Sequence, residues 1–186
     1  MKKREAKGKT ILDQMDESLL ERLSRFGADG FGDSCPLFPR GERDIIRHFH
    51  DWADRQMLKE SAKRGFDKRK VREKVASLVQ TRLEALAPYK SAVQAALAYH
   101  AKPWHSAEGL KALCTTVDAI WIAAGDTATD YNYYTKRGLL SGVYSATLLY
   151  WLSDTSKNHA ATWDFLEKRI ANVLTLGKWT RRRTAA

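Results

Sequence analysis

The sequence predicts an all-α fold, a bundle of about six to nine helices. Apolar residues recur every three or four positions along nearly the whole chain, which is the spacing of one helix face. Only 4 prolines interrupt the pattern, and β-branched runs are few. The 186 residues fit one domain with at most a small appendage, and a hydrophobic content of 44% excludes global disorder.

The N-terminal part predicts one or two helices followed by a loop. Residues 11–26 fit a single helix, whereas a capping box of Ser18 and Glu21 predicts two short helices that break near Asp16. Both interpretations are open. Residues 27–39 contain three glycines and two prolines, and they predict a loop with at most one helical turn.

Four helices are expected between Gly41 and Gly125. The first follows Gly41, has about 20 residues and carries one apolar and one charged face. The second ends at Pro88, and the third covers residues 91–100. Ser106 is expected to cap the fourth helix, which ends at Gly125.

The C-terminal third predicts a linker and two further helices. Residues 126–137 are polar and aromatic and are expected to form the linker. The most apolar helix follows at residues 139–152, and it must be buried or paired. A last helix is expected over residues 159–176, with Gly177 as its stop and a loose basic tail after it.

Charge does not by itself assign a partner. The formal net charge is +10, which favours phosphate-bearing partners such as nucleic acid, although anionic lipid headgroups and simple solubility also explain it. The basic residues fall in three separate segments (2–9, 59–72 and 181–183), and the Gly/Pro-rich loop stands where a recognition helix would be needed. We therefore expect no specific nucleic-acid binding.

Catalytic and metal-binding patterns are weak. His50 and Asp54 are spaced as a helical ligand pair, but a third ligand is missing and a solvated polar face explains them. Cys35 and Cys114 have no metal or disulfide spacing, which suits a reducing cytosol. Because nucleophile motifs and phosphate loops are also missing, the sequence predicts no catalytic residues and no metal site.

Two segments contain residue types that folding alone does not require. Gly138, Gly142 and Ala146 form a small-residue stripe, which predicts a tightly packed core or dimer helix, or a helix that lines an apolar lipid cavity. The residues expected to line that cavity are Leu113, Trp121, Val143, Tyr144, Leu148 and Trp151. The tyrosine-rich linker is typical of an interface anchor, unless Arg137 merely pins the turn by pairing with Asp126 or Asp130.

Three segments carry a resemblance to a known family. DAIWIAAGDTATDYNYYTKRGLLSGVYSATLLYWLSD (118–154) and TWDFLEKRI (162–170) resemble the ninth COQ protein family of ubiquinone biosynthesis. LFPRGERDIIRHFHDWADRQML (37–58) is similar to the upstream part of its bacterial members, so the resemblance covers about residues 37–177.

The resemblance implies a TetR-like all-α fold with a degenerate N-terminal helix-turn-helix region. It implies a non-enzymatic homodimer that binds an isoprenoid lipid and presents it to enzymes such as a di-iron demethoxyubiquinone hydroxylase. No cofactor is implied beyond a bound lipid or quinone precursor. The implied partner-binding residues are Trp121, Asp130, Asn132, Tyr133, Tyr134, Lys136 and Arg137.

The expected organisation is an N-terminal helical region (1–41), a lipid-binding and dimerisation domain (42–177) and a basic tail (178–186). The expected location is the cytoplasm, with peripheral contact at the inner face of the membrane. Such contact would use Trp179 and the arginines at 181–183. The alternative from another class is a TetR-like regulator that senses a small apolar ligand.

Overall fold

A computed structural model describes residues 10–26, 29, 31–32, 35–65, 69–126 and 131–183, with side chains except those of residues 26, 131–133 and 173–183. Over these ranges the fold is all-α, as expected, and a lone bridge between Cys35 and Phe38 is its sole β feature. The elements are α1 (Ile11–Phe26), α2 (Glu42–Arg64), α3 (Val71–Leu86), η2 (Ala87–Tyr89), α4 (Lys90–Ala101), α5 (Ser106–Ala124), α6 (Tyr131–Ser153), η3 (Lys157–His159) and α7 (Ala160–Arg183).

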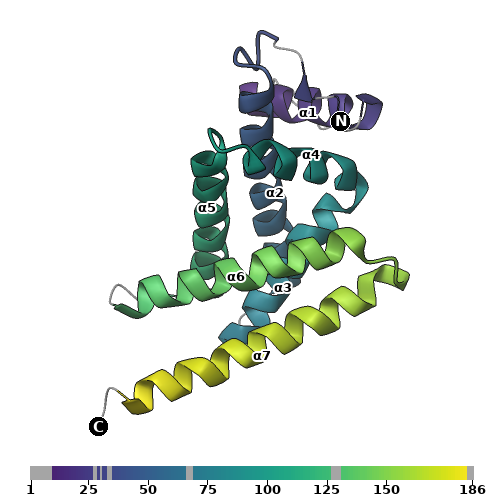
Figure 1. Cartoon of the computed structure of the whole chain (residues 1–186). Coiled ribbons are helices and arrows are strands. Elements are labelled where there is room, and N and C mark those ends of the chain that lie inside the picture. Colours follow the sequence, from purple (N-terminus) through teal and green to yellow (C-terminus); the bar gives the residue numbers. More distant parts are fainter. Residues whose placement is uncertain are drawn as a thin grey trace, which may run out of the picture.

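The helices enclose one continuous core. In Figure 1, α1 lies across the N-terminal end of α2, α5 runs alongside α2, and the long helices α6 and α7 run together across the other half of the molecule. Fully buried side chains join these parts, among them Ile45 of α2, Leu83 of α3, Ile120 of α5 and Leu166 of α7. No helix in the described part of the chain is long and apolar enough to span a bilayer.

The first helix is continuous, which decides between the two interpretations of residues 11–26. Its cap lies at Thr10, whose hydroxyl accepts a hydrogen bond from the backbone N–H of Asp13 at 3.2 Å. Asp16, where a break was considered, lies within the helix instead. Its carboxylate contacts His48 Nε2 at 2.7 Å and Arg55 Nη2 at 2.5 Å, which attaches α1 to α2.

The helix ends observed between residues 41 and 125 agree closely with those predicted from the sequence, except for the N-terminal cap of α5. Gly125 adopts the left-handed conformation (φ 88°) and ends α5. The expected cap at Ser106 is wrong, because its hydroxyl donates to the carbonyl of Pro103 at 2.8 Å and the cap position belongs to His105.

Two C-terminal boundaries also differ from expectation. Helix α6 begins at Tyr131, so more than half of the predicted linker is helical. Helix α7 continues through Gly177 to Arg183, because one interior glycine costs only about 1 kcal/mol and good helix formers surround it. The boundary expected at Gly177 is therefore not marked by a helix end, and the predicted division into domains stays a prediction.

Candidate functional site: an apolar cavity with a polar floor

An apolar cavity of about 340 Å³ lies between α2, α3, α4, α5 and α6. Leucine, valine and alanine residues from the last three of these helices make up most of its apolar lining. The larger polar side chains in its lining, which we call the polar floor, are His50, Arg82, His100, Thr116 and Tyr144, and Ser106 and Ser145 line the cavity too. A mainly apolar lining with a few polar groups suits a ligand that is largely apolar and carries a polar group.

A buried ion pair organises the polar floor. Arg82 Nε donates to Asp54 Oδ1 at 2.6 Å, and Thr116 Oγ1 lies 3.0 Å from both oxygens of the same carboxylate. Arg82 Nη1 also donates to the hydroxyl of Tyr144. Burial opposes the charge on Arg82, but Tyr144 and Asp54 outweigh it and raise the pKa of the guanidinium. Burial raises the pKa of Tyr144, so the phenol stays protonated.

A histidine pair joins the cavity to a second, smaller one. The Nε2 atoms of His50 and His100 lie 3.1 Å apart. Burial, with Arg82 and His100 adding to it, lowers the pKa of His50 to about 3, and burial also lowers the pKa of His100. Both rings are thus uncharged near neutral pH, with one nitrogen donating and the other accepting. The smaller cavity, of about 200 Å³, contains charged residues of α2 and α5, and both histidines line it too.

Glycine permits a close approach of α4 and α5 beside this pair. A Cβ atom built on Gly109 would lie 2.8 Å from Cβ of His100, closer than two such carbon atoms can approach. The backbone of α5 therefore contacts α4 directly at this point. This contact fixes the separation of two walls of the cavity.

The structure divides the residues expected to bind lipid into two groups. Leu113, Tyr144 and Leu148 line the apolar cavity. Val143 and Trp151 are buried in the core elsewhere, with Lys90 Nζ 4.7 Å from the centre of the Trp151 ring. The remaining residue, Trp121, lies outside the cavity.

The residues expected to bind a partner are held mainly by contacts within the chain. Trp121 Nε1 donates to the carbonyl of Lys136 at 3.3 Å, and Lys136 Nζ donates to Asp126 at 2.6 Å. Arg137 bonds Asp118 and lies 3.7 Å from Asp126, so the turn-pinning interpretation describes its geometry.

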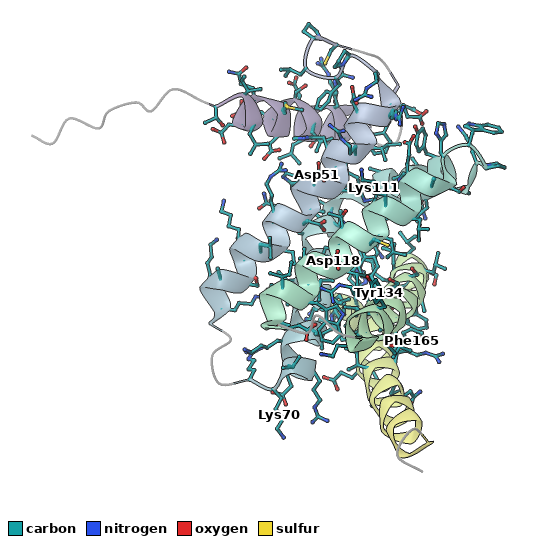
Figure 2. The ribbon with its side chains drawn as sticks, turned by 90° about the vertical axis from the view of Figure 1, so that its left-hand side faces the viewer. Asp51, Lys70, Lys111, Asp118, Tyr134 and Phe165 are labelled. Atoms are coloured by element: carbon teal, nitrogen blue, oxygen red, sulfur yellow. The ribbon has the colours of Figure 1, made fainter. Side chains whose placement is uncertain are left out.

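Tyr134 is largely exposed, at 74%. Figure 2 shows it near the start of α6, beside Asp118 of α5. Asp130 lies outside the described residues, as do the side chains of Asn132 and Tyr133.

The binding residues predicted from the sequence did not include Arg82, Thr116 or the two histidines. One signal could have identified Arg82, because it interrupts the apolar face formed by Leu78, Val79 and Leu86 on α3. A charged residue in such a position must find a buried partner. The partner is Asp54, which the sequence had placed on a solvated face. In the described part of the chain no cluster of three or more His, Cys, Asp or Glu side chains could hold a metal ion.

Comparison with known proteins matches this chain to one family. Residues 106–177 match the COQ9 family model. The chain is 35% identical over 145 residues to the mitochondrial ubiquinone biosynthesis protein COQ9 of Drosophila melanogaster, covering 75% of this chain and 44% of that protein. It is 36% identical over 111 residues to the Homo sapiens protein of the same name, covering 60% of this chain and 35% of that one. The chain thus spans less than half the length of these two relatives.

A solved structure matches the fold. A TetR transcriptional regulator from Nitrosomonas europaea superposes with a TM-score of 0.68 at 20% sequence identity, covering 88% of this chain and 98% of that one. At this identity the likeness concerns the fold alone. The expected TetR-like all-α fold is therefore confirmed, and so is the resemblance to the COQ9 family of ubiquinone biosynthesis.

Proposed function

We propose that this protein acts in ubiquinone biosynthesis as a non-enzymatic accessory protein. It binds a polyprenyl quinone precursor and presents it to a partner hydroxylase. The observation that carries the proposal is the apolar cavity with its polar floor, in a chain similar to proteins named for ubiquinone biosynthesis. A water-insoluble intermediate needs such a cavity to reach an enzyme outside the bilayer.

The polar floor suits a head group that accepts hydrogen bonds. Arg82 uses Nε and Nη1 in its bonds to Asp54 and Tyr144, and a guanidinium has five N–H groups. Further donors therefore remain for a carbonyl oxygen. Because the charge of Arg82 is compensated and the histidines are neutral, an uncharged quinone or phenol fits better than an anion.

The cavity volume limits how much of such a ligand is enclosed. A volume of about 340 Å³ lies near the lower end of the range of roughly 300 to 1,000 Å³ for ligand cavities. The head group and the first part of the chain fit, and a long polyprenyl tail extends through the mouth of the cavity.

The proposed homodimer uses the outer face of α6 and α7. Leu149 and Tyr150 of α6 are 60% and 40% exposed, and the Tyr150 ring stacks on Phe165 of α7 at 4.6 Å. Figure 2 shows Phe165 where the two helices lie together. Gly138 and Gly142 have open space where a Cβ atom would point, which leaves room for a closely packed second copy.

Native mass spectrometry of the protein purified from its host tests the proposal. We expect a co-purifying isoprenoid quinone or phenol in the natural chain, and its loss in Leu148→Asp, because a carboxylate in the cavity wall opposes an apolar ligand. Leu113→Gln is a milder second variant on the same cavity. The matched control is Ile122→Asp, which changes an exposed residue of α5 and should retain the ligand.

A natural chain without apolar ligand, or variants that retain it equally, would contradict the proposal. Gel-shift assays with genomic DNA fragments distinguish the proposed lipid-binding role from that of a TetR-like regulator. Specific DNA binding that persists at physiological salt would favour the regulator.

A further inference from the structure

The hydroxyl of Tyr144 carries a hydrogen-bond donor that is left without an acceptor. Tyr144 lines the apolar cavity and is 4% exposed. Its oxygen accepts a bond from Arg82 Nη1, whereas no group among the described residues accepts the phenolic proton. Burial raises the pKa of Tyr144, so the proton stays on this oxygen near neutral pH. A buried donor without an acceptor is costly, and an acceptor on a ligand in the cavity would remove that cost.

Arg82 determines where the phenolic proton can point. Its guanidinium carbon lies 5.4 Å from the centre of the Tyr144 ring, and its Nε is held by Asp54 Oδ1 at 2.6 Å. A guanidinium has N–H donors and no acceptor. The proton of Tyr144 must therefore be directed away from Arg82, while the bond from Arg82 fixes the position of the oxygen.

The strongest acceptor of this cluster does not line the apolar cavity. The carboxylate of Asp54 lines the smaller cavity instead, and it accepts bonds from Arg82 and Thr116. The histidine pair uses one Nε2 lone pair within itself. A Cβ atom built on Gly109 would lie 3.2 Å from Nδ1 of His100, so that nitrogen faces the backbone of α5. The polar floor therefore offers a ligand more donors than acceptors.

We propose that Tyr144 is the specificity-determining residue of the apolar cavity: its hydroxyl donates to a ring carbonyl, so the cavity selects a prenylated quinone over the corresponding hydroquinone. The inference rests on the proposed function, because it needs a quinone-like ligand, and it adds the oxidation state of that ligand. A ring carbonyl accepts the bond and brings no proton of its own. A hydroquinone brings two O–H groups into a lining that is short of acceptors, and each unpaired donor weakens binding.

Isothermal titration calorimetry of the ligand-free full chain tests this selection with three probes of similar shape. The first probe is a para-benzoquinone that carries three methyl groups and one prenyl group. The second is its hydroquinone, kept reduced by dithionite in anoxic buffer, and the third is the same substituted ring without oxygen atoms. Full substitution of the ring prevents its reaction with the free thiols of Cys35 and Cys114. We expect the quinone to bind at least about ten-fold more tightly than the hydroquinone.

Three variants separate the proposed hydrogen bond from the general cost of burying a polar ligand. Tyr144→Phe keeps the ring but removes the donor, and it should weaken quinone binding about ten-fold and hydroquinone binding by less than about three-fold. Binding of the oxygen-free probe should stay the same. The matched control is Tyr134→Phe, the same change at an exposed position of α6. Ser145→Ala tests the hydroxyl of the next residue in the cavity lining as the alternative donor.

Infrared spectroscopy of the bound quinone provides a readout that a purely structural role of Tyr144 would not change. A hydrogen bond to a carbonyl oxygen lowers its C=O stretching frequency. We expect a carbonyl band below the frequency of the same quinone in hexane, and Tyr144→Phe should move this band back towards the hexane value. Because the first comparison uses the natural chain, it stays decisive even if Tyr144→Phe folds poorly.

The outcomes distinguish this inference from the proposed function. Equal binding of quinone and hydroquinone would overturn the inference, and so would a carbonyl band that stays at its hexane frequency. A loss of quinone binding in Ser145→Ala but not in Tyr144→Phe would overturn it too. All three results would leave a cavity that binds a prenylated ring, so the proposed function would stand. Failure of all three probes to bind would refute the lipid-binding function and the inference with it.

Discussion

The buried pair of Asp54 and Arg82 allows a quantitative prediction for Asp54→Ala. The change leaves a guanidinium whose side chain is 3% exposed without its counter-charge, and it removes the acceptor of Thr116 Oγ1. Removing one partner of such a pair costs about 3 to 5 kcal/mol. A domain of this kind has a free energy of unfolding of about 5 to 15 kcal/mol, so the change removes at least about one fifth of it.

A matched control isolates the effect of burial. The pair of Lys168 and Asp164 has the same N–O separation of 2.6 Å, but its side chains are 71% and 63% exposed. Asp164→Ala should therefore cost at most about 1 kcal/mol. Urea denaturation at pH 7, monitored by tryptophan fluorescence, measures both free energies of unfolding.

A double substitution tests whether the cost of Asp54→Ala comes from the orphaned charge. Combining Asp54→Ala with Arg82→Met should cost at least about 2 kcal/mol less than the sum of the single changes, because no isolated charge remains. A loss below about 1 kcal/mol for Asp54→Ala, or strict additivity in the double variant, would refute the reasoning.

Two further predictions concern pH and self-association. The pKa of His50 is about 3 in the folded protein and about 6.5 when unfolded, so its contribution to stability is complete above pH 6.5 and is lost as the pH falls towards 3. We expect the free energy of unfolding to fall by about 2 kcal/mol between pH 7 and pH 5 through His50, and His50→Gln to reduce that fall; an unchanged pH dependence in urea titrations would contradict this. Gly142→Leu should leave monomer stability nearly unchanged, because its Cβ would meet open space, but should weaken the dimer in sedimentation experiments. Equal sedimentation of both proteins would count against a dimer face at Gly142.

Helix ends were predictable from sequence where a local signal dominated. Gly125 ends α5 because the turn needs the left-handed backbone conformation that glycine adopts readily. A glycine directly after the apolar pattern of a helix is recognisable in the sequence. The start of α6 was not predictable from residues 126–137 alone. Lys136 and Arg137 reach back to Asp126 and Asp118 across the junction, and these tertiary ion pairs support a helix in a segment rich in tyrosine.

The sequence predicted an apolar cavity, but it did not predict all of the residues that line it. Helical spacing indicated that Tyr144 and Leu148 share a face of an unusually apolar helix, and both line the cavity. Trp151 follows the same spacing but is covered by Lys90 from a distant part of the chain. Spacing along one helix cannot specify which other helix covers each position, and that arrangement decides between core and cavity.

The contact of Gly109 with His100 gives a single backbone position control over the dimensions of the binding chamber. Any side chain at position 109 would force α5 away from α4 and would widen the gap between the walls that carry Leu97 and Leu110. Because the atoms that such a side chain would meet belong to His100, the same change would also move one residue of the polar floor. The width of the cavity and the placement of its polar groups are therefore coupled at this position.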